Sequence, residues 1–132
     1  MTKEFHYPVE SKKADKIGDL TLIKDKKLLV IEQNGKLGKE NSVRALYKVD
    51  LAQANEKGEL TKELVVDLNE MGLDQLEKIE GVSVIDSQHL ALVNDNDFGV
   101  ESDFKEKENK LSYTIKNAPS YLILITLPKK LY

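Results

Sequence analysis

The sequence predicts an all-β fold made of antiparallel strands. Two observations lead to this expectation: short apolar segments with strand-like alternation recur along the chain, and polar or glycine-containing turns separate them. The chain has 132 residues, which is enough for one small unit with a substantial hydrophobic core. The order of the segments then predicts how the strands are arranged.

An internal repeat organises these segments. Residues 16–34, KIGDLTLIKDKKLLVIEQN, align without a gap with residues 78–96, KIEGVSVIDSQHLALVNDN, so the two copies are 62 residues apart (78 − 16). A fixed-offset repeat indicates one supersecondary unit used twice, although two amphipathic hairpins can also resemble each other by chance. The identical residues are Lys16/Lys78, Ile17/Ile79, Ile23/Ile85, Leu28/Leu90 and Asn34/Asn96.

Each copy of the repeat predicts a β-hairpin. In the first copy an alternating arm at 20–23 and a polar turn at 24–27 precede a continuous apolar arm at 28–31, which is typical of a central strand covered on both faces. Two further β-rich segments complete a four-stranded, up-and-down unit in this copy, at 44–51 and 63–68. The strands expected in the second copy lie at 81–85, 90–94 and 121–127, with a weaker one at 111–115.

The connections between these strands are expected to contain little helix. Good helix formers occur at 51–56 and 69–80, but both segments are short, so we expect at most one or two helical turns there. Residues 101–110, ESDFKEKENK, hold seven charged residues in ten, which indicates a solvated loop, assigned here as 101–118. The chain is therefore interpreted as a single unit of two blade-like repeats, about 10–70 and 71–132.

Four-stranded antiparallel units with a period of roughly 60 residues most simply indicate blades of a β-propeller. A closed propeller needs at least four blades, and this chain supplies about two. The chain is then part of a larger propeller, or it associates with copies of itself, or it forms a small β-sandwich. Unpaired strand edges would favour assembly, because their backbone groups can pair with another chain.

Composition narrows the classes of partner. The net charge is −3 with pI near 5.5, and Lys and Glu are interspersed, which argues against a nucleic-acid or anionic-membrane partner. No Cys is present, so disulfides and thiolate metal sites are excluded. The first residues lack the apolar core of a signal peptide, and the longest apolar run, 121–127, is far shorter than a membrane span of about 20 residues. We expect a soluble, intracellular protein, or an extracellular one if an export signal precedes these residues.

Several segments carry a resemblance to a known family. The most specific are the Glu80-Gly81 step inside 78–86 and the run NDNDFG at 94–99. Weaker likenesses are an aromatic strand at 5–9, KIGDLTLI at 16–23, LLVIE at 28–32, LYKVDLAQA at 46–54 and the apolar strand at 121–127. Together they resemble the C-terminal portion of the phytase-like β-propeller family, named for an esterase-like activity of phytase. The likeness is poorest at 101–118, and Gln33 stands where the family usually has Arg.

The resemblance implies two functional hypotheses. One is a partial phytase-like module that is non-catalytic alone and assembles through exposed strand edges, as a homo-oligomer or with missing propeller blades. The alternative is a Ca²⁺-dependent phosphoester hydrolase acting on a phosphorylated small molecule as part of a complete propeller. In that case the cation would bridge substrate oxygens and activate water. We prefer the first hypothesis for this chain.

The candidate metal ligands are the polar residues at one end of the second hairpin. Glu80 begins one strand, and Asn94, Asp95, Asn96 and Asp97 end the next, so all five are expected at the same end of the sheet. Carboxylate and carboxamide oxygens suit Ca²⁺. The competing interpretation is that these side chains only form Asx-turns and cap the strand end.

Candidates for substrate binding are few. Arg44 is the sole arginine, so it is the only side chain that could bind a phosphate through two parallel hydrogen bonds. The alternative is that Arg44 is a solvent-exposed strand residue without a ligand. Glu32 is a second candidate beside it. The two histidines, His6 and His89, are expected at the surface, and no Gly-x-Ser-x-Gly motif is present.

Overall fold

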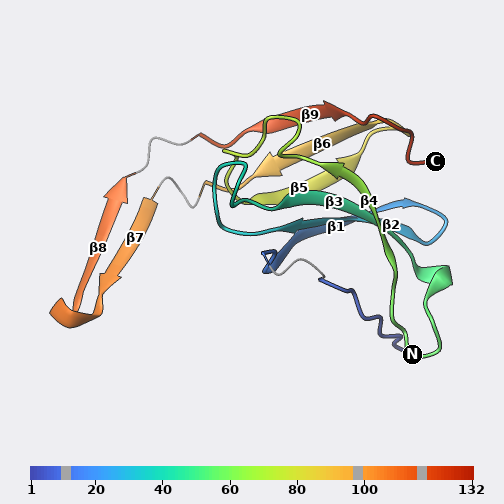
Figure 1. Cartoon of the computed structure of the whole chain (residues 1–132), viewed down its shortest axis with the longest axis horizontal. Helices are drawn as coiled ribbons and strands as arrows, with labels where there is room; N and C mark the ends of the chain where they lie inside the picture. The colour runs from blue at the N-terminus through green and yellow to red at the C-terminus, as the bar shows by residue number, and fades with distance from the viewer. Residues whose placement is uncertain (10–12, 97–99, 116–118) are drawn as a thin grey trace.

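The computed structural model describes residues 1–9, 13–96, 100–115 and 119–132. Its fold is all-β and antiparallel, as the sequence predicts (Figure 1). The strands are β1 (Lys16–Lys24), β2 (Lys27–Gln33), β3 (Arg44–Asp50), β4 (Lys62–Asp67), β5 (Ile79–Val84), β6 (His89–Asn94), β7 (Val100–Lys105), β8 (Lys110–Ile115) and β9 (Leu122–Thr126).

The first sheet has the predicted four strands in up-and-down order, β1-β2-β3-β4. Its central strand β2 is apolar on both faces because both faces are covered. Leu29 and Ile31 enter the main core, whereas Val30 packs in a second cluster on the opposite face. The alternation of side chains along a strand explains why the apolar run is continuous here.

The second sheet has three strands in the order β5-β6-β9. Strands β5 and β6 are the second copy of the hairpin formed by β1 and β2, and β9 pairs with β6 where β3 pairs with β2 in the first sheet. Among the described residues, no strand pairs with the other edge of β9. Within the described residues, the second sheet therefore has no counterpart of β4.

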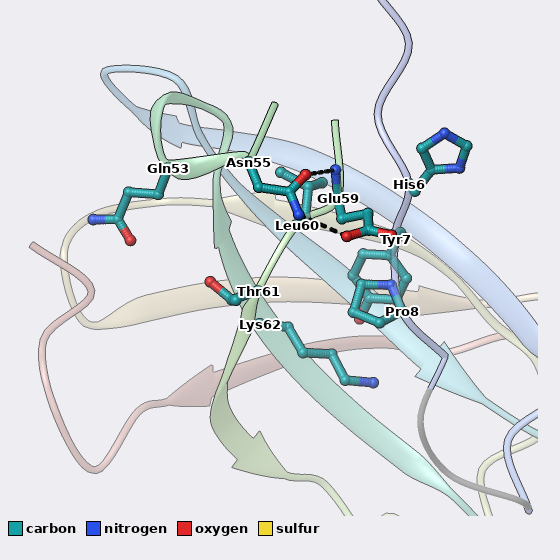
Figure 2. Close-up of a pocket in the computed structure, with 9 residues that line it drawn as sticks. All are labelled: His6, Tyr7, Pro8, Gln53, Asn55, Glu59, Leu60, Thr61 and Lys62. Atoms are coloured by element: carbon teal, nitrogen blue, oxygen red, sulfur yellow. Dashed lines mark hydrogen bonds between the residues drawn. The ribbon is translucent and has the colours of Figure 1, made fainter. Parts of the chain in front are cut away.

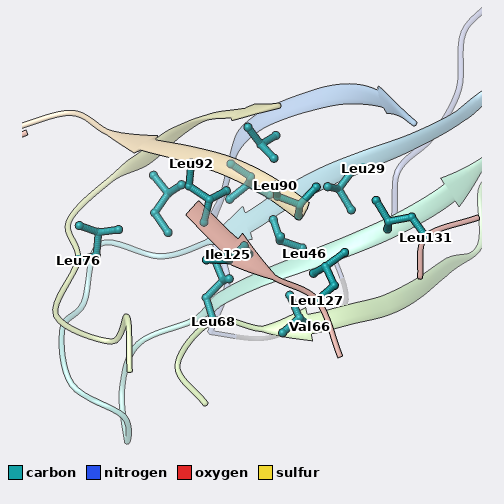
Figure 3. Close-up of a cluster of buried hydrophobic side chains, with 13 residues drawn as sticks. Leu29, Leu46, Val66, Leu68, Leu76, Leu90, Leu92, Ile125, Leu127 and Leu131 are labelled. Atoms are coloured by element: carbon teal, nitrogen blue, oxygen red, sulfur yellow. The ribbon is translucent and has the colours of Figure 1, made fainter. Parts of the chain in front are cut away.

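The two sheets stack face to face, and the main hydrophobic core lies between them (Figure 3). The two sheets come close together where β1 lies beside β5. At this position a Cβ on Gly18 would overlap the carbonyl oxygen of Ile79, so only glycine allows such an approach. Stacked antiparallel sheets are consistent with two blade-like units. The core residues of the first sheet and the turn after it are Leu29, Ile31, Leu46, Val66, Leu68 and Leu76; those of the second are Ile79, Val82, Leu90, Leu92, Ile125, Leu127 and Leu131.

The charged segment that the sequence assigns to a loop instead forms a hairpin. Strands β7 and β8 pair along their whole length and are joined by a 3₁₀ turn at Glu106–Glu108, with Asn109 in the left-handed conformation. The expectation of a loop is wrong for 101–115, because Leu111, Tyr113 and Ile115 alternate with polar residues in β8, and β7 pairs with this strand. The weaker strand expected at 111–115 is confirmed as part of β8, and residues 116–118 lie outside the described residues.

The connections contain little helix, as expected. Leu51–Gln53 forms one 3₁₀ turn, in which the Ala52 N–H donates to the Asp50 carboxylate. The other segment with helix formers folds into hydrogen-bonded turns between Leu68 and Leu76, with Gly72 at positive φ. In the part of the chain that the structure describes, no helix has the length and apolarity needed to cross a membrane.

Candidate functional site

The acidic end of the second hairpin is arranged partly as expected. The pairing of Ile79 with Asn94 places Glu80 and the end of β6 at the same end of the sheet. Glu80 is exposed, whereas Asn94 is buried and its Oδ1 accepts the Tyr121 N–H at 2.7 Å. Asp95 is half-buried, and its backbone N–H donates to the Lys78 carbonyl at 2.9 Å.

The Asn94 side chain thus binds the backbone of Tyr121, the residue just before β9. Asp97, the fifth proposed ligand, lies outside the described residues. Within the described ranges, no three His, Cys, Asp or Glu side chains come together in a group that could hold a metal ion. A pocket of about 290 Å³ does lie beside this end of the sheet, and Glu77, Asn94 and Asn96 contribute to its wall. A calcium site at this end of the sheet therefore stays a prediction.

Arg44 is neither solvated nor open to a phosphate. Its side chain is 1% exposed, Nε donates to the Leu76 carbonyl at 2.6 Å, and a terminal nitrogen donates to the Lys36 carbonyl at 2.8 Å. Burial lowers the pKa of the Arg44 guanidinium, and the nearby charges of Asp74 and Glu77 act in the opposite direction. Arg44 ties two connecting segments to the start of β3, so its role in this structure is to hold the fold together.

Gln33 connects the two sheets. Its carboxamide Nε2 donates to the Ile79 carbonyl at 2.9 Å, and the Ile79 N–H donates to its Oε1 at 3.1 Å. Asp19 makes a second link, because its Oδ2 accepts the Val82 N–H at 2.9 Å. Gln33 stands where the family usually has Arg. An arginine could donate to the Ile79 carbonyl but could not accept the Ile79 N–H, because arginine has no acceptor atom.

Glu32 lies at the centre of a buried polar cluster on the outer side of the first sheet. Its side chain is 0% exposed, and Oε2 accepts hydrogen bonds from Lys62 Nζ at 2.6 Å and from the Tyr7 hydroxyl at 3.0 Å. The Lys62 side chain is 4% exposed, and its Nζ lies 4.3 Å from the ring centroid of Tyr47 and 5.3 Å from that of Tyr7. Glu32 Oε1 has no hydrogen-bond partner among the described residues.

The sequence suggested Glu32 but gave no reason to select Tyr7 or Lys62. Glu32 is 25 residues from Tyr7 and 30 residues from Lys62, so the contacts depend on the course of the chain between the strands. The one available signal was alternation: Tyr7 lies two residues after Phe5, and both pack on the outer cluster with Val30. Because Lys62 already neutralises Glu32, this buried pair is first of all a structural feature.

A pocket of about 630 Å³ lies between the N-terminal segment and the chain that leads into β4 (Figure 2). The N-terminal segment is held there by backbone hydrogen bonds, from the His6 N–H to the Gly58 carbonyl and from the Leu60 N–H to the His6 carbonyl. His6 is exposed, as the sequence predicts. The side chains of Tyr7, Asn55, Glu59 and Lys62 line the pocket, and the Asn55 carboxamide is bonded to Glu59. His89 is also exposed and contacts Asp86 in the β5–β6 turn.

The outer faces of the two sheets differ in how they are covered. On the first sheet, the N-terminal residues Phe5 and Tyr7 pack against Val30 and Val49. On the second sheet, Leu122 is 75% exposed and Leu124 is 70% exposed. Two cross-strand rows on this outer face, Gly81–Val93–Leu122 and Ser83–Ala91–Leu124, contain no charged residue, and the next row pairs His89 with Thr126.

Comparison with known proteins gives one match. The family model described as Phytase-like, esterase-like activity of phytase, matches residues 1–98. No curated protein and no solved structure matches the chain. The matched range contains both hairpin copies and the outer cluster around Glu32. With most of its length matched, the chain belongs to the phytase-like family described by an esterase-like activity of phytase.

Proposed function

We propose that this chain is a partial phytase-like module that is non-catalytic alone and assembles through exposed strand edges and apolar sheet faces. The observation that carries the proposal is the outer face of the β5-β6-β9 sheet. Two of its cross-strand rows hold Val93, Leu122 and Leu124 in exposed positions, and these two rows contain no charged residue. Exposed apolar surface of this kind on a sheet marks an interaction site.

The edge of β9 supports the same proposal. This edge carries a row of backbone N–H and C=O groups that no described strand pairs. Free edges of this kind are templates for pairing with a further strand, and proteins usually shield them with charges, proline or a covering segment. The edge strand LILIT contains none of the shielding residues.

The state of the candidate site residues favours a non-catalytic role. Arg44, Glu32 and Asn94 are buried and each is engaged in hydrogen bonds within the fold. A residue that binds a phosphate or positions water needs polar atoms directed at the ligand. The engagement of these three side chains within the fold supports a non-catalytic role.

Light scattering coupled to size-exclusion chromatography tests the proposal. We expect the wild-type chain to have a mass above 14.9 kDa that rises with concentration, and a Leu122→Lys/Leu124→Lys variant to have the mass of a monomer. Met71→Lys is the control, because it places a lysine at an exposed apolar residue outside this sheet, in the turns after β4. A wild-type chain that stays monomeric at high concentration, or that hydrolyses phosphomonoesters alone, would contradict the proposal.

The alternative function is a Ca²⁺-dependent phosphoester hydrolase as part of a complete propeller. The pocket of about 290 Å³ beside Asn94 and Asn96 favours a polar ligand at that end of the sheet. Calorimetric titration with Ca²⁺ tests it: binding should be lost in Asp95→Asn and kept in Asp103→Asn, which removes a carboxylate on the β7–β8 hairpin. Equal heats in the two variants would remove support for this alternative.

A further inference from the structure

We propose that two copies of this chain exchange their β7–β8 hairpins, so that the hairpin of each copy covers the outer face of the β5-β6-β9 sheet of the other. This inference rests on the proposed function and names the partner that it leaves open. The inference is based on two apolar surfaces of the same chain, one on the β7–β8 hairpin and one on the second sheet. Among the described residues, nothing packs on either surface.

The hairpin has one apolar face. The register pairs Phe104 with Leu111, and Tyr113 and Ile115 follow on the same face at steps of two. All four are exposed, Ile115 at 87%. The described residues of the opposite face are polar or charged: Asp103, Lys105, Lys110, Ser112 and Thr114.

The hairpin stands apart from the two sheets (Figure 1). An isolated two-stranded hairpin is at best marginally stable in water, because it has no second layer on which to bury its apolar face. Packing on a sheet would bury Phe104, Leu111, Tyr113 and Ile115 and leave the charged face in solvent. The amphipathic pattern of the hairpin therefore predicts that its apolar face packs on another apolar surface of similar width.

The outer face of the second sheet is such a surface. Leu122 and Leu124 project from β9, and Val93 and Ala91 lie beside them on β6. The equivalent outer face of the first sheet is covered, because Phe5 of the N-terminal segment packs on the outer cluster there. Only the second sheet is left without such a cover in the described part of the chain.

A second copy of the chain can cover both surfaces at once, the apolar face of the hairpin and the outer face of the second sheet. Within one chain the hairpin lies away from the outer face of the β5-β6-β9 sheet (Figure 1). Reciprocal exchange between two copies makes two identical contacts and leaves neither apolar surface uncovered, which is the property of a closed two-fold dimer. The expected mass is twice 14.9 kDa, about 30 kDa.

Disulfide trapping tests the contact directly, because the wild-type chain has no cysteine. Chains with Tyr113→Cys are mixed with chains carrying Leu124→Cys and oxidised. We expect a disulfide-linked pair of one chain of each kind, several-fold more abundant than when Thr114→Cys, on the opposite hairpin face, replaces Tyr113→Cys. Equal yields from the two mixtures would overturn the exchange, and so would a link formed within monomers of the Tyr113→Cys/Leu124→Cys double variant.

A second variant separates failure of the exchange from failure of assembly. Leu111→Lys/Ile115→Lys alters only exposed residues of the hairpin, so the two-sheet core should be unaffected. We expect this variant to be monomeric, with a two-fold fall in mass from the wild type. If it keeps the wild-type mass while Leu122→Lys/Leu124→Lys is monomeric, hairpin exchange is wrong and assembly stands. If the wild type itself is monomeric, both proposals fail.

Discussion

The side chain of Gln33 pairs with the backbone of Ile79 as a neighbouring strand would. One atom of its carboxamide donates to the Ile79 carbonyl at 2.9 Å, and another accepts the Ile79 N–H at 3.1 Å. Both residues are buried, and they lie 46 positions apart in the chain. The two copies of the repeat are thus joined by a polar link at the point where the sheets are closest.

Replacing Gln33 by leucine should destabilise the protein strongly. The substitution keeps the approximate volume but leaves the Ile79 N–H and C=O buried without partners, so we expect a loss of about 2–4 kcal/mol. Urea unfolding followed by circular dichroism measures it. Gln75→Leu is the control, because Gln75 is exposed and its carboxamide bonds to the neighbouring Asp74. Equal stability of the two variants would show that the carboxamide is not a link between the sheets.

Gly18 should not tolerate alanine. The added Cβ would overlap the Ile79 carbonyl oxygen, and relieving this overlap would move β1 away from β5 at a cost of about 1–3 kcal/mol. Gly35→Ala is the matched control, since the nearest atom to its Cβ is Lys16 Nζ at an ordinary 3.5 Å. Thermal unfolding compares the two variants. A Gly18→Ala variant as stable as Gly35→Ala would contradict the close packing of β1 on β5.

Removing Lys62 alone should cost more than removing the whole buried ion pair. Lys62→Met leaves the Glu32 carboxylate buried without its cation, for which we expect a loss of about 3–5 kcal/mol. In the double variant Glu32→Leu/Lys62→Met no charge is left uncompensated, so much of the stability should return. A double-mutant cycle by urea unfolding measures the coupling. Additive losses in the cycle would contradict a direct pair.

The turn between β5 and β6 predicts a small dependence of stability on pH. The Gln88 N–H holds the pKa of Asp86 below its ordinary value, with the His89 side chain adding to the effect. A lowered pKa in the folded state means that the carboxylate stabilises the fold above its unfolded pKa of about 3.9, and that this contribution disappears as the pH falls through the folded value.

Asp86→Asn should therefore be less stable than the wild type at neutral pH, and the difference should shrink as the pH falls from about 5 to about 2. Urea unfolding at a series of pH values measures the difference. Asp25→Asn, in the corresponding turn of the first copy, serves as the control. A difference that stays constant across this range would show that the Asp86 turn does not titrate as the structure implies.

The sequence predicted the strands better than it predicted the site. Alternation and the continuous run at β2 identified the strands of both copies, because the periodicity of a strand is a local property. Of the β7–β8 hairpin, the sequence indicated only the strand at 111–115, because 101–110 has seven charged residues and one apolar residue, Phe104. For Asn94 the sequence left metal binding and capping as alternatives, because the Tyr121 N–H that its side chain accepts lies 27 positions away.

The roles of Arg44, Glu32 and Gln33 could not be predicted from the sequence. Each depends on a partner about 25–46 residues away, such as the Leu76 carbonyl for Arg44 and Lys62 for Glu32. Charged residues are usually solvated, so their burial is visible only when the partners are known. Lys62, which neutralises Glu32, has no feature in the sequence that distinguishes it from the other lysines.

Hydrogen–deuterium exchange of β9 at low and high protein concentration is the most direct test of assembly through the second sheet. The account predicts that the amides of Leu122–Thr126 exchange more slowly at high concentration, whereas those of the already covered strand β2 do not change. Identical exchange of β9 at all concentrations would contradict it.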